Sequence, residues 1–306
     1  MSPKQPCSQC GNKAPFDPEL AYRRLARKHL ALAELVRKQI SQTSGTRELA
    51  PLHTAALLDE LARIVGGEPA GAEEFPECCL VGRQNPNNSM DWFCTGTLIH
   101  PRVVISAGHC VIQSRLANIV ALRASNENAL AHADLVPVRG ITAHPLYVQT
   151  HQVHDLSVMI LRRPSEVTPV ALASAAEINS AQKVTLAGFG NDDVKSTRGF
   201  GVKRKVTVDL RAIRRSSADD LAAQEHQFGF DADLEFVAGG SGFDSCNGDS
   251  GGPAYIDVAG TLKVAGATSR GIEGTQDPCG DGGIYSRVDA NLDFIRQTAT
   301  ASGIDL

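Results

Sequence analysis

From residue 64 onward the chain consists of short apolar runs separated by turn-forming residues. The runs are rich in Val, Ile and Leu, and they cover residues 98–99, 103–106, 156–161, 184–187, 206–210 and 262–267. Together with the 28 glycines of the chain, they favour β structure with tight turns. This spacing predicts an antiparallel sandwich or barrel, followed by one closing helix over residues 291–300.

The first 63 residues have a different pattern and predict a small helical leader. Asp17-Pro18 is typical of a helix start, with an N-cap followed by proline. Apolar residues at helical spacing follow among basic ones, and a second helical stretch covers residues 51–62. We therefore expect two parts, a leader over residues 1–63 and a body over residues 64–306.

Charge is distributed unevenly between these two parts. The leader carries 10 Lys and Arg against 6 Asp and Glu, whereas the body carries 20 against 28. The opposite net charges of the two parts are consistent with a leader that docks on the body. Alternatively, the charged residues of both parts are simply exposed to solvent. The formal net charge of −4 argues against a nucleic-acid partner.

The sequence also limits the membrane and targeting roles of the chain. No window of about 18 apolar residues exists, so we expect no transmembrane helix. Residues 1–7 lack the apolar segment of a standard secretory signal. For the basic leader helix, packing on the body is a simpler expectation than lying on a membrane surface.

Four of the eight cysteines have no obvious partner in the sequence. Cys7 and Cys10 resemble half of a zinc knuckle, but structural zinc needs four ligands and no second C-x-x-C exists. We expect no metal there; free thiols, or a link to Cys78 or Cys79, are the alternatives. The two adjacent cysteines would face opposite sides of a strand.

A glycine-rich segment provides the candidate nucleophile. Gly248-Asp249-Ser250-Gly251-Gly252 places a serine on a turn whose glycines can direct backbone N–H groups inward. A polar loop without chemistry is the alternative reading of such a short motif. The nucleophile elbow of α/β-hydrolases is excluded because its histidine follows the serine, whereas the last histidine here is His226.

The base and its orienting acid must therefore lie upstream of Ser250. Among nine histidines, His109 differs because it ends the apolar run 103–108 and precedes Cys110, which could hold it by a crosslink. Asp155 opens the apolar run 156–161, where a buried acid needs a partner. Considered alone, Asp155 could also be a capping or turn residue.

Taken together, three segments resemble the trypsin/chymotrypsin family of serine proteases. Ser106-Ala107-Gly108-His109-Cys110 resembles the histidine box of the family, with Gly108 where alanine is usual. Asp155-Leu156-Ser157-Val158 resembles the aspartate box, and residues 246–253 resemble the serine box almost unaltered. The resemblance runs from Ile64 to the C-terminal helix and implies two six-stranded antiparallel β-barrels.

The resemblance also implies a reaction and the residues that perform it. It implies a serine endopeptidase in which Ser250 attacks a peptide carbonyl, His109 transfers the proton and Asp155 orients the histidine. The N–H groups of Gly248 and Ser250 would form the oxyanion hole. No cofactor is expected, and the partners would be protein or peptide substrates. A protease-like binding or regulatory module without catalysis is the alternative.

Specificity for Arg or Lys is implied by Asp244, which occupies the position of the pocket floor. The pocket walls would include Ser269, Gly271 and Gly283, whose small size leaves room for a long side chain. Arg270 departs from the family, which usually has tryptophan there. This departure suggests a preference for acidic groups beside the scissile site.

Activation by proteolysis is implied by Arg63-Ile64-Val65-Gly66-Gly67. Cleavage after Arg63 would free the α-amine of Ile64, which could pair with Asp249 and order the oxyanion loop. We therefore expect an inactive proform.

The resemblance pairs Cys94 with Cys110 and Cys246 with Cys279. Two disulfides imply an oxidising compartment, extracellular or periplasmic, although no standard signal peptide is visible.

Overall fold

We analysed a computed structural model, which describes residues 67–112, 117–149 and 152–306. The chain divides into two units, Met1–Glu60 and Leu61–Leu306, and every described residue belongs to the second. The predicted leader helices and the junction residues Arg63 and Ile64 lie outside the described residues.

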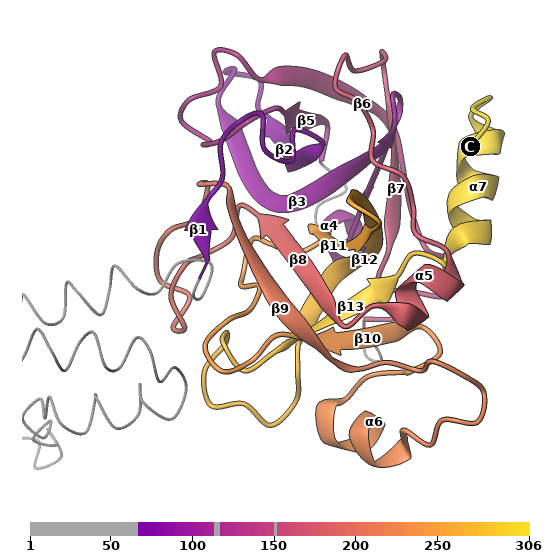
Figure 1. Ribbon diagram of the computed structural model, residues 1–306. Coiled ribbons are helices and arrows are strands. Elements are labelled where there is room, and N and C mark those ends of the chain that lie inside the picture. The colour runs from indigo at the N-terminus through magenta and orange to yellow at the C-terminus, as the bar shows by residue number, and fades with distance from the viewer. Residues whose placement is uncertain (1–66, 113–116, 150–151) are drawn as a thin grey trace, which may run out of the picture. The chain divides into compact units, whose positions relative to one another are not determined.

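The first half of the body forms a closed barrel of six antiparallel strands, in the upper part of Figure 1. Its strands pair in the order β2-β3-β4-β7-β6-β5. In chain order they are β2 (Cys78–Gln84), β3 (Met90–His100), β4 (Val103–Ser106), β5 (Ile119–Leu122), β6 (Asp134–Ala143) and β7 (Ser157–Leu161).

The second half forms another six-stranded antiparallel barrel, because β8 pairs with both β9 and β11 and so closes the sheet. The strands are β8 (Lys183–Gly188), β9 (Arg204–Ala212), β10 (Glu235–Ala238), β11 (Pro253–Val258), β12 (Thr261–Gly271) and β13 (Gly283–Arg287). A short strand, β1 (Glu68–Pro69), adds to β9 from outside. The prediction of two six-stranded barrels is confirmed.

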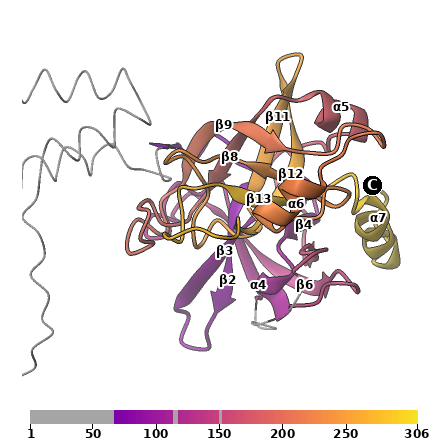
Figure 2. The same ribbon diagram turned by 90° about the horizontal axis from the view of Figure 1, so that it is seen from below.

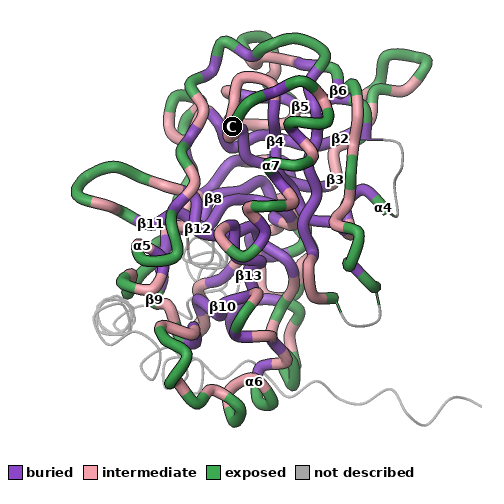
Figure 3. The backbone as a smooth tube through the Cα atoms, turned by 90° about the vertical axis from the view of Figure 1, so that its right-hand side faces the viewer, coloured by how far each residue is buried: buried purple, intermediate pink, exposed green. Residues whose placement is uncertain are grey.

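The unbroken apolar runs of β4 and β7 have a structural reason. Along β7, Val158 and Ile160 belong to a core cluster that continues into the second barrel, whereas Met159 and Leu161 belong to a cluster of the first barrel alone. Both faces of the strand are therefore buried, as the continuous burial along the central strands in Figure 3 also shows. A strand buried on both faces is apolar throughout and does not alternate.

Four described helices complete the body. They are α4 (His109–Ile112), α5 (Ala175–Ser180), α6 (Ala222–Phe228) and α7 (Leu292–Ala301). Figure 1 shows α6 at the end of the second barrel that lies away from the first, and in Figure 2, seen from below, α6 lies in front of the strands. The predicted closing helix is confirmed as α7, from which Phe294 places its ring edge-on to His144 at 4.6 Å between centroids. No helix among the described residues is long and apolar enough to cross a membrane.

The adjacent cysteines of β2 are free thiols with no exposed surface. Cys78 belongs to the cluster that continues into the second barrel and Cys79 to the cluster inside the first. They thus face opposite sides of the strand, as predicted. Neither thiol forms the suggested link to the leader, whose Cys7 and Cys10 lie outside the described residues.

Candidate active site

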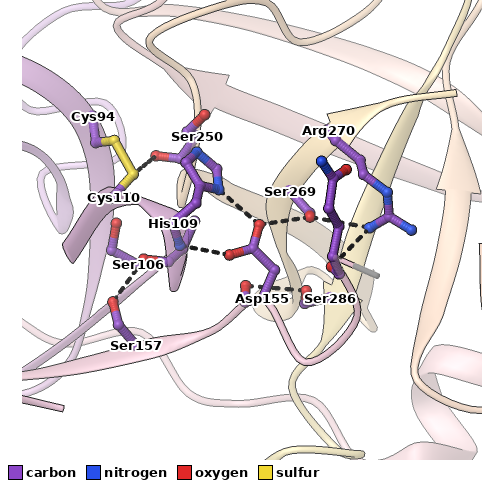
Figure 4. A network of polar contacts seen from close by, with 12 residues as sticks. Cys94, Ser106, His109, Cys110, Asp155, Ser157, Ser250, Ser269, Arg270 and Ser286 are labelled. Atoms are coloured by element: carbon purple, nitrogen blue, oxygen red, sulfur yellow. Dashed lines mark hydrogen bonds and ion pairs between the residues drawn. A yellow bond between two sulfur atoms is a disulfide. The ribbon is translucent and has the colours of Figure 1, made fainter. Parts of the chain in front are cut away.

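His109 and Asp155 form a hydrogen-bonded pair at the end of the first barrel (Figure 4). Asp155 is 2% exposed and its Oδ2 lies 2.7 Å from His109 Nδ1. Its Oδ1 accepts the backbone N–H of His109 at 2.8 Å. Because Nδ1 faces a carboxylate, the neutral imidazole carries its proton there and presents an unprotonated Nε2 as a base.

The buried carboxylate of Asp155 also has partners in the second barrel. Ser269 Oγ donates to Asp155 Oδ2 at 2.7 Å, and Ser286 Oγ donates to the Asp155 carbonyl at 3.1 Å. The hydrogen bond from Ser269 offsets part of the cost of burying the charged carboxylate, and the one from Ser286 fixes the backbone of Asp155. Ser269, predicted only as a pocket wall, therefore also supports the acid. A Cβ at Gly108 would lie 3.1 Å from Asp155 Oδ1. This distance is short, but a small shift would accommodate the alanine that is usual in the histidine box.

Ser250 lies on a turn that packs against the end of β4, close to the histidine segment. A Cβ at Gly251 would stand 2.1 Å from Ser106 Oγ, so only glycine allows this approach. The Ser250 carbonyl accepts the N–H of Thr95 at 2.9 Å, and Figure 4 draws Ser250 next to His109. Among the described residues, Ser250 Oγ makes no hydrogen bond to the imidazole. Such contacts are often loose without substrate and tighten in the complex.

Two backbone N–H groups beside the serine are available to a ligand. Within the described part of the chain, neither Gly248 N nor Ser250 N donates a hydrogen bond. Gly248 has φ +99°, a conformation that side chains rarely adopt. Free donors next to a serine have the arrangement that stabilises an oxyanion.

Asp244 lies buried close to this turn, with 1% exposure. Its Oδ2 accepts the N–H groups of Gly282 at 3.1 Å and Gly280 at 3.4 Å, and the Ser245 hydroxyl lies 3.4 Å from its Oδ1. Burial raises the pKa of Asp244 to about 7, although the backbone N–H groups oppose the shift. In the described residues no cation pairs with this carboxylate, so it could receive one from a ligand.

Two predicted wall glycines, Gly271 and Gly283, are direct partners across β12 and β13. A Cβ at Gly283 would lie 2.9 Å from Asp244 Oδ1 and 2.9 Å from the Tyr285 hydroxyl. At Gly271 the nearest atom to such a Cβ would be the Pro278 carbonyl at 3.6 Å. Gly283 therefore lies directly against the Asp244 carboxylate, where a side chain would not fit without a shift.

Asp249 is also buried, with 3% exposure. Gly190 N donates to its Oδ1 at 2.7 Å and Cys246 N donates to its Oδ2 at 2.8 Å. Burial raises the pKa of Asp249 to about 6, against these N–H groups and the positive charge of Arg204. No described side chain forms an ion pair with Asp249.

Arg270 stands beside the site in a bidentate ion pair with Glu235, a strand residue with no exposed surface. Nη1 donates to Glu235 Oε1 at 2.6 Å and Nη2 to Oε2 at 2.9 Å. Nη2 also donates to the Gly229 carbonyl at 2.9 Å. The guanidinium is therefore neutralised by the protein itself, which weighs against the predicted preference for acidic groups beside the scissile site.

Two disulfides cross-link the elements that carry these residues. Cys94 of β3 is joined to Cys110 of α4, directly after His109. Cys246 is joined to Cys279, which ties the segment between Asp244 and Ser250 to the loop before β13. Each bridge closes a loop of 16 or 33 residues, for which stabilisation of about 3 kcal/mol is typical.

Metal-ligand residue types gather at one place in the described chain, namely Cys94, His109 and Cys110. The two sulfur atoms are bonded to each other, so they offer no thiolate to a metal.

Sequence reasoning missed Thr95, Ser286 and Glu235, which support the site through hydrogen bonds. Glu235 begins the apolar β10, where a buried acid could have indicated a cationic partner. Thr95 directly follows a bridging cysteine, which was the only available signal.

Comparisons with known proteins agree with this arrangement. The family model described as trypsin matches residues 64–295. A trypsin from Saccharopolyspora erythraea is 30% identical over 79% of this chain and all of its own length. A tryptase from Mus musculus is 32% identical over 76% of this chain and 87% of its own. A CLIP domain-containing serine protease B4 from Anopheles gambiae is 23% identical over 76% of this chain and 69% of its own. With both barrels closed and the family model spanning nearly all of them, the chain belongs to the trypsin family of serine endopeptidases.

Proposed function

We propose that the chain cleaves peptide bonds after Arg or Lys, with Ser250, His109 and Asp155 as the catalytic residues. The observation that carries the specificity is the carboxylate of Asp244, which is buried without a cation among the described residues and lies against Gly283. A buried carboxylate of this kind favours a guanidinium or ammonium group over a neutral side chain.

The first half of the reaction is acylation of the serine. Ser250 Oγ attacks the carbonyl carbon of the scissile bond while His109 Nε2 accepts the hydroxyl proton. The developing oxyanion accepts hydrogen bonds from the N–H groups of Gly248 and Ser250. His109 then donates the proton to the leaving amine, and the C–N bond breaks to leave an acyl-enzyme on Ser250.

Hydrolysis repeats these steps with water as the nucleophile. His109 accepts a proton from the attacking water and returns it to Ser250 Oγ as the ester bond breaks. Throughout, Asp155 keeps Nδ1 protonated and stabilises the imidazolium. The hydrogen bonds from Ser269 and from the His109 backbone N–H hold Asp155 in place for this role.

We further propose that residues 1–63 are a propeptide and that cleavage after Arg63 activates the enzyme. The freed Ile64 ammonium would pair with Asp249, whose carboxylate lies buried against Gly188 and Gly190 without a described cation. An ion pair there would relieve the cost of burial that raises the pKa of Asp249. Because Arg63 suits the proposed pocket, the enzyme could cut its own leader.

The leader has two other candidate roles. Its basic charge and the acidic charge of the body would favour docking before cleavage. A targeting or partner module that is not removed is the competing possibility, and the N-terminal sequence of the purified protein distinguishes them. The two disulfides favour an oxidising compartment, extracellular or periplasmic.

Hydrolysis of a peptide p-nitroanilide ending in Arg tests the proposed reaction. The chain cut after Arg63 should hydrolyse it, prefer Arg and Lys over neutral residues, and lose activity on treatment with a serine-directed inhibitor. Ser250→Ala is the matched control and should be inactive. If the wild type and Ser250→Ala were equally inactive, the alternative of a silent protease-like binding module would replace the enzyme assignment for this chain.

A further inference from the structure

The oxyanion turn, residues 247–250, has four consecutive carbonyl groups, and each of them accepts a hydrogen bond. Asn247 O accepts from Asn191 N at 2.9 Å, and Gly248 O accepts from Thr95 Oγ1 at 2.8 Å. Asp249 O accepts from Gly252 N at 2.7 Å, and Ser250 O accepts from Thr95 N at 2.9 Å. Since a peptide unit is planar, a fixed carbonyl also fixes the direction of the N–H in the same unit.

Thr95 supplies two of these four bonds from the other barrel. It lies on β3 of the first barrel, 153 residues before Gly248, and has no exposed surface. Its hydroxyl donates to Gly248 O and accepts the N–H of Phe189 at 3.3 Å. Its own carbonyl accepts the hydroxyl of Ser106 at 2.7 Å, close to the His109 segment. Thr95 therefore connects the oxyanion turn and the loop that follows β8 through its hydroxyl, and the histidine segment through its carbonyl.

The hydroxyl is the only side-chain group among the four donors; the other three are backbone N–H groups. Among these four carbonyl contacts it is thus the one that depends on residue identity. Gly248 has no side chain to restrict its backbone, and its φ of +99° lies in a region that glycine adopts freely. On the other side of Gly248 stands the ring of Phe200, 2.5 Å from where a Cβ would lie.

We propose that Thr95 is a positioning residue for the oxyanion hole, whose hydroxyl fixes the Gly248–Asp249 peptide and thereby the two neighbouring N–H donors. Without it, Gly248 O loses its partner, and the peptide is held only through its N–H, which Asp249 donates to Cys246 O at 2.9 Å. The donors then spend less time aligned with the developing oxyanion. This inference rests on the proposed catalytic roles of Gly248 and Ser250.

Thr97 offers a matched control on the same strand, two residues further along. It is also fully buried, but its hydroxyl makes no hydrogen bond among the described residues. Replacing either threonine by valine preserves shape and removes a hydroxyl. Only Thr95→Val removes a bond to the oxyanion turn.

The experiment uses the full chain cut after Arg63, with active sites counted by titration. Loss of an oxyanion donor typically lowers kcat by about 10²–10³, so misalignment in Thr95→Val should lower it by about tenfold or more. The affinity for benzamidine, which needs only the Asp244 space, should change by less than about twofold. The affinity for an arginine boronic acid, whose serine adduct places an oxygen near the donors, should fall with kcat. Thr97→Val should match the wild type in all three measurements.

Thr95→Ser and Thr95→Ala distinguish loss of the hydrogen bond from a folding defect. Both variants lose the methyl group, but only Thr95→Ala also loses the hydroxyl. Serine should restore most of the activity that alanine lacks. Equal loss of benzamidine and boronate affinity in Thr95→Val, or full activity in Thr95→Ala, would overturn the inference. An inactive wild type would instead overturn the proposed function, so the two failures are distinguishable.

Discussion

Gly283 lies so close to Asp244 that a methyl group at Gly283 would stand 2.9 Å from the Asp244 carboxylate. The same methyl group would lie 2.9 Å from the Tyr285 hydroxyl and 3.0 Å from Ser245 Oγ. These three nearest atoms belong to the floor of the proposed pocket. The proposed specificity for Arg and Lys thus depends on the absence of a side chain at this position.

Gly283→Ala should therefore weaken recognition of Arg and Lys. Overpacking of about 1–3 kcal/mol corresponds to a loss of roughly 10- to 100-fold in kcat/KM for an Arg substrate. Gly140→Ala is the control, since its Cβ would meet no atom within 4 Å. Steady-state kinetics on both variants would decide, and unchanged kcat/KM in Gly283→Ala would remove this space from the proposed pocket.

Binding of a cation in the pocket should depend on pH through Asp244. Because its pKa is raised to about 7, the carboxylate loses its charge as the pH falls below neutrality. Benzamidine affinity should then fall, approaching about tenfold per pH unit well below that value. Calorimetry on Ser250→Ala measures this without autolysis. A second substitution, Asp244→Asn, should make binding weak and independent of pH, whereas a persisting pH dependence would assign it to another group.

Asp244→Asn should also stabilise the fold at neutral and alkaline pH. The folded-state pKa of about 7 lies above the usual value of 3.8, so the folded protein binds the extra proton and wild-type stability declines as the pH rises from about 4 to 7. An amide avoids this loss, with a gain on the order of 2–4 kcal/mol at pH 8. It also fits, because both backbone N–H groups donate to the same oxygen.

Urea unfolding at several pH values, in the Ser250→Ala background, measures this gain. Asp249→Asn is the comparison and should gain less, because each of its oxygens accepts a different backbone N–H and one bond would be lost. Parallel pH profiles for wild type and Asp244→Asn would contradict the prediction.

Arg63→Gln should leave the chain uncut and inactive if activation requires the free amine of Ile64. The substitution removes the positive charge that the Asp244 pocket is proposed to recognise, so self-cleavage at the junction should stop. N-terminal sequencing of the wild type should read Ile64-Val65-Gly66-Gly67. Arg47→Gln, within the leader, should mature normally. Full activity from uncut Arg63→Gln would show that no zymogen exists.

Glu235→Gln should create a preference for acidic residues near the scissile bond. In the wild type, Glu235 neutralises Arg270 through two hydrogen bonds, and the glutamine variant would leave the guanidinium unpaired. We expect kcat/KM for a peptide with Glu preceding Arg to rise by about 3- to 10-fold relative to a neutral peptide, equivalent to about 1 kcal/mol. The double variant Glu235→Gln/Arg270→Gln should lose this preference; if it does not, another residue causes it.

Local patterns in the sequence were sufficient for the elements that are buried on both faces. The runs 103–106 and 156–161 predicted β4 and β7 almost to the residue, because strands packed on two sides must be apolar throughout. Strands such as β6 went unpredicted because only a minority of their residues are buried, which leaves a weak pattern. The helix α4 escaped prediction because it is a single turn held by a disulfide and by Asp155.

The residues of the candidate site also fall into those that the sequence predicted and those that only the structure revealed. Ser250, His109 and Asp155 could be named from sequence because each occurs in a short segment with a recognisable order of residues. The sequence by itself thus determined the family and the type of reaction. Only the tertiary structure decided that Glu235 neutralises Arg270, that Gly283 faces Asp244, and that Thr95 holds the oxyanion turn. These relationships join residues that are 35, 39 and 153 positions apart. A hydrogen bond or a close contact depends on distance in space, and no local pattern records which distant strands the closure of two barrels brings together.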